Sequence, residues 1–525
     1  MKLIRSTAII SFFTMMSRIL GLIRDQLTAY FLGAGPINDA LITAMKLPNL
    51  FRRMFAEGAF NAAFIPLYVR HKQESGDGSA ADFAGEAWAS LFFIVALIVI
   101  GFQITMPWSL NMIGGGLEHA AQAGEQSVYD LAVLYARITM PYLLLMSLAA
   151  LLSGMLNTEN RFAIAAFVPV LYNLVAISIL AAMWGRDVPV EKLALYLSIG
   201  MTVAGFLQLG LLFWAVRRAK IRLPFKRPRL TPRVKRLWLL GIPGMISAGI
   251  THINITVSNL LATFREGAAS WLYYSDRLYQ LPLGIIGIAM GVALLPALSN
   301  RLKSGDEKGA MSSMNRAIEI AALLTLPATF ALAIMPEFLV SGLFELSGGR
   351  FKASDTVQTS VALRMFAFGL PAFVLLKVLT PAFFARENTK TPMIFAGVSA
   401  IINVILGASL FFTVGFFGLA LATTIAGWTN VILLGRILLR EKLLVFDKRL
   451  LDRLPRIAAA SALMGLAIWP ISQWGNDRLT GNLITDYFML MIVCGTGLII
   501  YVLASLIFKS FGANDLRYAF RRGSR

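Results

Sequence analysis

"YFMLMIVCGTGLIIYVLASLIF" (487–508) is a run of 22 residues without a charged side chain. A second run, "SLFFIVALIVIGFQITM" (90–106), is nearly as long. About 20 apolar residues are enough to cross the hydrocarbon core of a membrane as an α-helix. The short alternating segments of a membrane β-barrel are not seen. These runs therefore predict an all-α polytopic membrane protein.

The composition of the whole chain agrees with this fold class. The 525 residues are 57% hydrophobic and only 14% charged, whereas soluble domains are about 25% charged. The first residues, "MKLIRSTAIISFFTMM" (1–16), have the basic start and short apolar stretch of a signal peptide. No small-residue cleavage site follows them, so we predict that they belong to a retained first helix.

The residues that usually carry redox or metal chemistry are scarce. Cys494 is the single cysteine, which excludes a disulfide, a CxxC pair or a cysteine zinc site within one chain. The three histidines, His71, His119 and His252, are far apart in the sequence. No GxxxxGK[ST] phosphate-binding loop occurs, so coupling to ATP within this chain is not expected. We therefore expect no catalytic residues, no metal and no cofactor.

The apolar runs predict about fourteen membrane-spanning helices. We place them near 5–32, 37–69, 83–112, 128–156, 162–184, 193–216, 233–261, 269–299, 309–335, 356–385, 391–412, 417–439, 454–472 and 486–508. An even number puts both termini on the same side of the membrane.

The basic residues predict which side that is. Segments on the side of the N-terminus hold 32 of the 48 lysines and arginines, ten of them within 217–236, and segments on the opposite side hold six. Because basic residues concentrate in cytoplasmic loops, both termini are predicted to be cytoplasmic. The net charge of +20 thus follows mostly from topology. We expect contact with the phospholipid bilayer and its anionic head groups, and no binding of nucleic acid.

A weak internal repeat divides the chain. Three residue pairs share an offset of 230: Pro66 and Pro296, Pro141 and Pro371, Asn173 and Asn403. Six helices per copy keep the two copies in the same orientation, which predicts a parallel repeat about an axis along the membrane normal. We therefore predict two six-helix lobes, 1–225 and 226–450, followed by two extra helices and a cytoplasmic tail, 451–525.

Charged residues inside the predicted spans concentrate in the first two helices. Such residues normally face a cavity or the interior of the bundle, because charge in hydrocarbon is costly. Asp39, Lys46 and Arg53 are seven residues apart and share roughly one helical face. Asn49, Arg52 and Glu57 lie beside that face.

Two other helices extend this pattern. Ser270 and Arg277 are also seven residues apart, with Asp276 and Gln280 adjacent. Arg18 and Arg24 are six apart in the first helix, where Gly21 between them could allow a bend that turns both to a cavity.

Together with Lys377, the arginines predict a cationic cavity with Asp39, Glu57 and Asp276 as partial counter-ions. Guanidinium groups bind phosphate through two hydrogen bonds and stay charged when desolvated. The expected ligand is an anion such as a phosphate or diphosphate. The alternative for a single residue is an internal ion pair, such as Arg24 with Asp25 or Arg53 with Glu57.

Several of these stretches resemble a known family. They are "SRILGLIRD" (17–25), "NDALITAMKLPNLFRRMFAEGAFNAAFIPLY" (38–68), "LNTENRFAIAAFVPVLYN" (156–173), "SWLYYSDRLYQLPLGIIGIA" (270–289) and "ENTKTP" (387–392). They are similar to the bacterial MurJ/MviN family, the lipid II flippase branch of the MOP exporter superfamily. The resemblance implies a fourteen-helix inner-membrane protein that moves undecaprenyl-diphosphate-linked disaccharide-pentapeptide to the outer leaflet for peptidoglycan synthesis and cell-wall biogenesis.

The resemblance also implies a set of substrate-binding residues. It carries over to Arg18, Arg24, Asp39, Lys46, Asn49, Arg52, Glu57, Ser270, Asp276, Arg277 and Lys377. Gln280 departs from the pattern, because some members of the family have Glu at this position. In the family the last two helices form a groove for the prenyl tail. We expect a monomer, with other cell-wall synthesis proteins as candidate partners.

Other functions fit the sequence less well. An exporter of cationic drugs would need an acidic or aromatic cavity, although a flippase for another lipid-linked oligosaccharide or amphiphile stays open. A membrane-embedded enzyme would need clusters of acidic residues at a membrane face. The predicted helices 233–261 and 391–412 contain no Asp or Glu, so a carboxylate-based sodium site there is not supported.

Overall fold

Helices make up all the regular structure in the described parts of the chain, which are residues 2–55, 59–119 and 127–510 of the computed structural model. The described residues form seventeen α-helices and one short 3₁₀ helix, Gly115–His119. The predicted all-α membrane fold is therefore confirmed.

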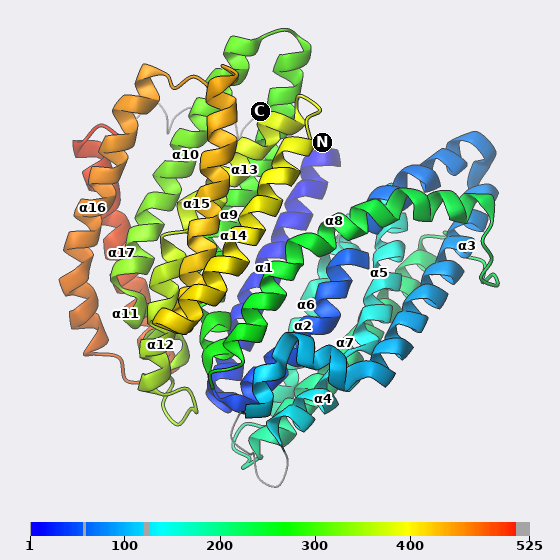
Figure 1. Ribbon diagram of the computed structural model, residues 1–525, viewed down its shortest axis with the longest axis horizontal. Coiled ribbons are helices and arrows are strands. Elements are labelled where there is room, and N and C mark those ends of the chain that lie inside the picture. The colour runs from blue at the N-terminus through cyan, green and yellow to red at the C-terminus, as the bar shows by residue number, and fades with distance from the viewer. Residues whose placement is uncertain (1, 56–58, 120–126, 511–525) are drawn as a thin grey trace. The chain divides into compact units, whose positions relative to one another are not determined.

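By packing, the chain divides into two units, Met1–Ser270 and Trp271–Arg525 (Figure 1). The first unit contains α1 (Lys2–Leu32), α2 (Pro36–Phe55), α3 (Ala59–Gly114), α4 (Val128–Thr139), α5 (Pro141–Thr158), α6 (Phe162–Ala182), α7 (Val190–Arg218) and α8 (Pro232–Ala262). Within it, α1 packs along α6, α8 packs along α3, and α2 contacts α4. The predicted lobe boundaries at 225 and 450 stay a prediction.

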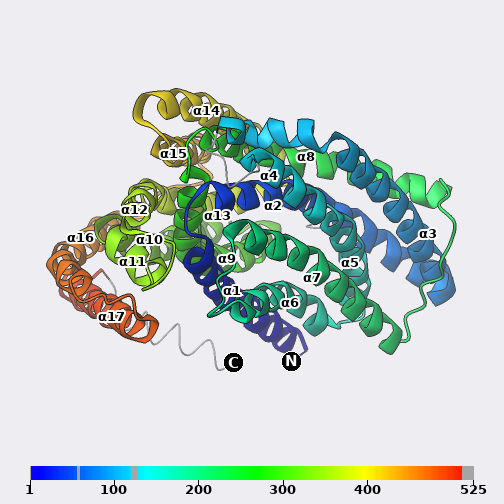
Figure 2. The ribbon, with the colours of Figure 1, turned by 90° about the horizontal axis from the view of Figure 1, so that it is seen from below.

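The second unit begins inside α9 (Ala268–Lys303). It continues with α10 (Glu307–Ile334), α11 (Pro336–Phe344), α12 (Ala353–Ala367), α13 (Leu370–Phe384), α14 (Lys390–Val414), α15 (Phe417–Arg440), α16 (Lys448–Asn476) and α17 (Leu483–Ile507). Figure 2 shows α14 beside α15 and α16 beside α17, and both pairs are in contact. The last two helices attach to α10 and α11, where the Tyr501 hydroxyl donates to the Leu323 carbonyl oxygen at 2.7 Å.

Ten helical segments among the described residues are long and apolar enough to span a membrane. They correspond to ten of the fourteen predicted spans. The other four predicted spans are occupied by α1, α2, α8 and α9, and three of these carry the predicted cationic residues.

Two predicted spans are each divided into two helices at a proline. The predicted helix 128–156 breaks between α4 and α5, where Pro141 begins α5. The predicted helix 356–385 breaks between α12 and α13, where Pro371 follows the first residue of α13. Proline has no N–H and its ring clashes with the preceding turn, which ends a helix. The two prolines are 230 residues apart, which is the offset of the predicted repeat.

The predicted connection at 70–82 is helical on both sides of a kink. The residues of α3 form two helices that meet at Gly76, where the backbone is not helical and φ is 79°. Glycine adopts this left-handed conformation without a steric penalty. The break between the predicted spans 37–69 and 83–112 thus lies at one glycine, and the polar residues on both sides of it are helical.

Candidate functional site

The Arg24 side chain on α1 is fixed by side chains from α1 and α6. Its Nη1 donates to Asn173 Oδ1 at 3.0 Å, and its Nη2 donates to Asp25 Oδ1 at 2.6 Å. The guanidinium carbon also lies 5.2 Å from the centre of the Tyr172 ring, within the range of a cation–π contact. The internal pair of Arg24 with Asp25, one alternative from the sequence, is present in this structure.

The buried Asn173 joins α6 to α1. Besides accepting from Arg24, it donates through Nδ2 to the Ser17 carbonyl oxygen at 2.9 Å. Gly21 faces this amide, since a Cβ added there would lie 3.8 Å from Nδ2. The helix α1 is continuous from Lys2 to Leu32, so Gly21 allows a close approach of α6 within a single helix.

Polar side chains on α2 form a second group. Asn49 Oδ1 accepts from Arg52 Nε at 3.1 Å, and its Nδ2 donates to the Met45 carbonyl oxygen at 2.8 Å. One turn earlier, Lys46 donates to Asn259 of α8. Asn259 is itself buried and donates to the Ile113 carbonyl oxygen at 2.7 Å.

The buried Asp39 at the start of α2 holds the start of α9. One carboxylate oxygen accepts from the Gly267 N–H at 2.7 Å. The other accepts from the Ser270 N–H at 2.7 Å and from its hydroxyl at 2.6 Å. Gly267 has a φ of 82°, a conformation that favours glycine. Asp39 thus satisfies amide groups that the first turn of a helix leaves without backbone partners.

The second unit holds the remaining predicted residues. Gln280 donates to the carboxylate of Asp276 one turn away on α9. Arg277 Nη2 donates to the Tyr273 hydroxyl at 3.0 Å, and its guanidinium carbon lies 4.7 Å from the centre of the same ring. Lys377 on α13 is exposed.

The predicted set is therefore distributed over both units. The first unit contains Arg18, Arg24, Asp39, Lys46, Asn49, Arg52 and Ser270, and the second contains Asp276, Arg277 and Lys377. Within the first unit, Asp39 meets Ser270 and Asn49 meets Arg52. Arg18 is half-buried on α1. Glu57 lies outside the described residues, as does the predicted pair of Arg53 with Glu57.

The arrangement favours recognition of an anion. Half-buried guanidinium groups such as those of Arg52, which contacts Asn49, and Arg277, which contacts Tyr273, can bind phosphate oxygens. In the described ranges, no three His, Cys, Asp or Glu residues are grouped so that they could hold a metal ion.

Two site residues were missed by the sequence analysis. Asn259 was not singled out, and Asn173 was noted only as the partner of Asn403 in the repeat. Asn173 is the single asparagine of α6 and stands in a largely apolar stretch, whereas Asn259 follows Asn254 in the polar stretch "THINITVSN" (251–259). A buried amide needs hydrogen-bonding partners, so an isolated asparagine in a predicted span is a signal that could have identified Asn173.

Comparison with known families gives a match to the lipid II flippase MurJ over residues 28–492. A probable lipid II flippase MurJ from Rhizobium meliloti (strain 1021) is 42% identical over 474 residues, covering 90% of this chain and 88% of that protein. A second relative, the lipid II flippase MurJ of Burkholderia cenocepacia, is 31% identical and covers 83% of each chain.

Solved structures show the same relationship. A lipid II flippase MurJ in an inward closed conformation is similar with a TM-score of 0.77 and 26% identity, over 97% of this chain and 99% of that one.

Proposed function

This chain belongs to the family of the lipid II flippase MurJ, and we propose on that premise that it moves lipid II across the membrane. It is a multi-pass protein of the bacterial inner membrane. The proposed substrate is the undecaprenyl-diphosphate-linked disaccharide-pentapeptide, carried from the inner to the outer leaflet. The family is one of transporters, and we propose that this chain catalyses no covalent step.

The observation that carries the proposal is a set of half-buried arginines on helices that occupy predicted membrane spans. Arg24, Arg52 and Arg277 lie on α1, α2 and α9, which occupy the predicted spans 5–32, 37–69 and 269–299. Helices of this kind are stable in a membrane where their polar faces line a water-filled or ligand-filled cavity. A cavity lined with arginines would replace the hydration of a diphosphate, while the prenyl tail stays in lipid.

Membrane potential supplies a direction for this movement. An inside-negative potential of about 100 mV favours outward movement of each negative charge by about 2.3 kcal/mol. We propose alternating access by two lobes, 1–225 and 226–450, with the pair 451–525 serving the lipid tail. In this proposal the protein acts as a monomer with both termini in the cytoplasm, and other cell-wall synthesis proteins are candidate partners.

Growth and reconstituted flipping test the proposal together. Alanine at Arg18, Arg24, Arg52 or Arg277 should abolish growth when the variant is the only copy. Lysine at these positions should impair growth, because lysine keeps the charge but lacks the planar guanidinium group that binds phosphate through two hydrogen bonds. Arg186→Ala, in an exposed loop between α6 and α7, is the matched control and should support growth.

The same variants should fail to move lipid II between the leaflets of reconstituted vesicles. Four folded and inserted alanine variants that sustain growth would overturn the proposed site. Faster flipping of a different lipid-linked oligosaccharide than of lipid II would instead favour the alternative substrate class.

A further inference from the structure

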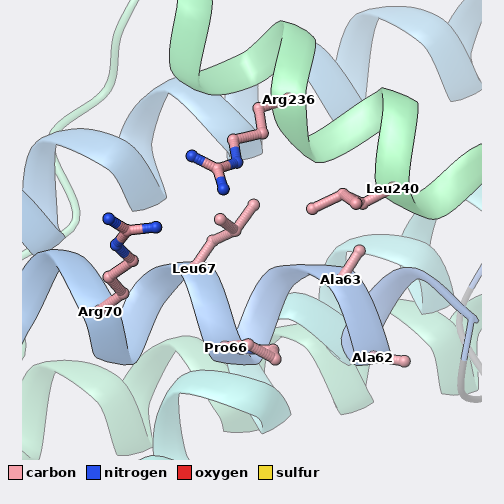
Figure 3. Close-up of a pocket in the computed structure, with 7 residues that line it drawn as sticks. All are labelled: Ala62, Ala63, Pro66, Leu67, Arg70, Arg236 and Leu240. Atoms are coloured by element: carbon pink, nitrogen blue, oxygen red, sulfur yellow. The ribbon is translucent and has the colours of Figure 1, made fainter.

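A cleft of about 470 Å³ lies between the first turns of α3 and those of α8, both in the first unit (Figure 3). Five of its lining residues are apolar: Ala62, Ala63, Pro66, Leu67 and Leu240. The other two are Arg70 and Arg236. None of them belongs to the predicted substrate-binding set.

The walls of this cleft are held in place by contacts between α3 and α8. The indole N–H of Trp238 donates to the Ser90 hydroxyl at 2.8 Å, and both residues are buried. The Trp238 ring also lies 5.9 Å from that of Phe60. Gly241 allows a close approach, because a Cβ there would lie 3.7 Å from the Ala63 methyl group. The two helices are therefore in firm contact beside the cleft.

Polar and apolar groups are separated along the cleft. Figure 3 shows both guanidinium groups toward one end, with Leu240, Ala62 and Ala63 toward the other. Each arginine is one helical turn from an apolar lining residue on its own helix, Arg70 from Pro66 and Arg236 from Leu240. The cleft thus has the polarity of an amphiphile with an anionic head and an apolar chain.

The charge at the polar end limits the kind of head group. Arg70 Nε donates to Glu74 at 2.7 Å in an exposed pair. Among the described residues, no hydrogen bond or ion pair is found for Arg236. Two guanidinium groups and one carboxylate leave one formal positive charge. A phosphodiester, with a single negative charge, matches this better than a diphosphate does.

We propose that this cleft binds an anionic phospholipid of the cytoplasmic leaflet. Its phosphodiester contacts Arg70 and Arg236, and one acyl chain lies along Leu67 and Leu240. The site is at the cytoplasmic level because α8 begins inside the basic segment 217–236, which the positive-inside rule assigns to the cytoplasm. Basic pockets between membrane helices on this side are suited to lipid head groups.

Photocrosslinking of the full-length protein in phosphatidylcholine nanodiscs tests the proposal. The probe is phosphatidylglycerol with a photoreactive acyl chain, and the readout is its crosslinking yield to the peptides that contain 62–70 and 236–240. Unlabelled phosphatidylglycerol should compete for the site. The double variant Arg70→Gln, Arg236→Gln should lose roughly tenfold in yield, since two charge-assisted contacts are removed.

Arg233→Gln is the matched control, because Arg233 is exposed on the same first turn of α8 but does not line the cleft. It should crosslink like the unmodified protein. Equal crosslinking of the double variant would overturn the proposal. Equal competition by phosphatidylcholine would show general lipid contact and would also overturn it. Equal competition by inorganic phosphate would show a free-anion site, and equal competition by lipid II would show a substrate site, and either result would overturn the proposal.

This binding measurement does not involve flipping. A protein that flips lipid II but does not crosslink at the cleft refutes only the phospholipid site. A protein that crosslinks but does not flip refutes only the proposed function.

Discussion

Asn173 orients Arg24, and its replacement should therefore affect transport more than stability. Asn173→Ala removes the acceptor for Arg24 and the donor for the Ser17 carbonyl oxygen. The loss of a hydrogen bond of this kind costs about 0.5–1.5 kcal/mol. We expect a loss of this size in the free energy of unfolding, measured in detergent, together with a loss of flipping, because the Arg24 side chain loses the contact with α6 that fixes its Nη1 group.

The internal repeat provides a matched control for this prediction. Asn403 is also buried, and its amide donates to Thr423 at 3.2 Å rather than contacting an arginine. Asn403→Ala should lower stability by a similar amount and leave flipping largely intact. If the two variants lost flipping equally, the contact between Asn173 and Arg24 would have no specific role.

Gln280 is expected to act as a hydrogen-bond donor. Its amide donates to Asp276, so Gln280→Leu should leave that carboxylate without this partner and reduce the flipping rate. Gln280→Glu should retain function, because two carboxyl groups in contact share a proton, so that the protonated one still donates to the other. Flipping by the two purified variants checks this, and full activity of the leucine variant would exclude the position from the site.

Residue chemistry was more predictable than residue contacts. Arginines inside apolar runs indicate a cationic site, because a charged side chain in a membrane span is costly unless it faces a cavity or a polar partner. The partners of those charges depend on helices far away in the sequence. Asn173 is 149 residues from Arg24, and no local spacing brings them together. Asp39 was predicted as a partial counter-ion, which stays a prediction, and the hydrogen bonds that its oxygens accept from Gly267 and Ser270 could not be read from the sequence.

At the scale of helices, the connection between α2 and α9 should depend on Asp39. Asp39→Ala removes the acceptor for two backbone N–H groups and one hydroxyl. Ser270→Ala removes only the hydroxyl, so both backbone bonds remain. We expect a loss of about 1–3 kcal/mol in the free energy of unfolding for Asp39→Ala and a clearly smaller one for Ser270→Ala.

Thermal unfolding of the two variants in detergent measures this difference. Equal losses would show that the backbone bonds contribute little and that the hydroxyl contact dominates. Gly267→Ala is a third variant at this connection, and the left-handed backbone there predicts a further loss.

Helix ends were less predictable than the presence of helices. Apolar length identified the spans because hydrocarbon thickness sets it. The breaks at Pro141 and Pro371 follow from proline chemistry, although both prolines were used in the sequence only as evidence of a repeat. The short helix α11 was not predicted, since nine residues are too few to show as an apolar span.

At the scale of the molecule, hydropathy identifies a membrane protein, and the asymmetry of basic residues predicts how it is oriented. The helix α7 has 29 residues, which at 1.5 Å per residue is about 43 Å and exceeds a hydrocarbon core of about 30 Å. We therefore predict that the loops at its two ends face opposite sides of the membrane. The loop after α7 is strongly basic and is tied to α3 by Lys226, which lies 2.8 Å from Asp82.

Cysteine labelling tests this orientation directly. After Cys494→Ala, single cysteines at Arg186 and at Arg227, both exposed, lie before and after α7. A membrane-impermeant maleimide added to intact cells should label Arg186→Cys and not Arg227→Cys, which should react only after the membrane is opened. Labelling of both from one side would mean that α7 does not span the membrane. Labelling of Arg227→Cys alone from outside would reverse the predicted orientation, and it would also place the cleft beside Arg70 and Arg236 at the outer instead of the cytoplasmic level of the membrane.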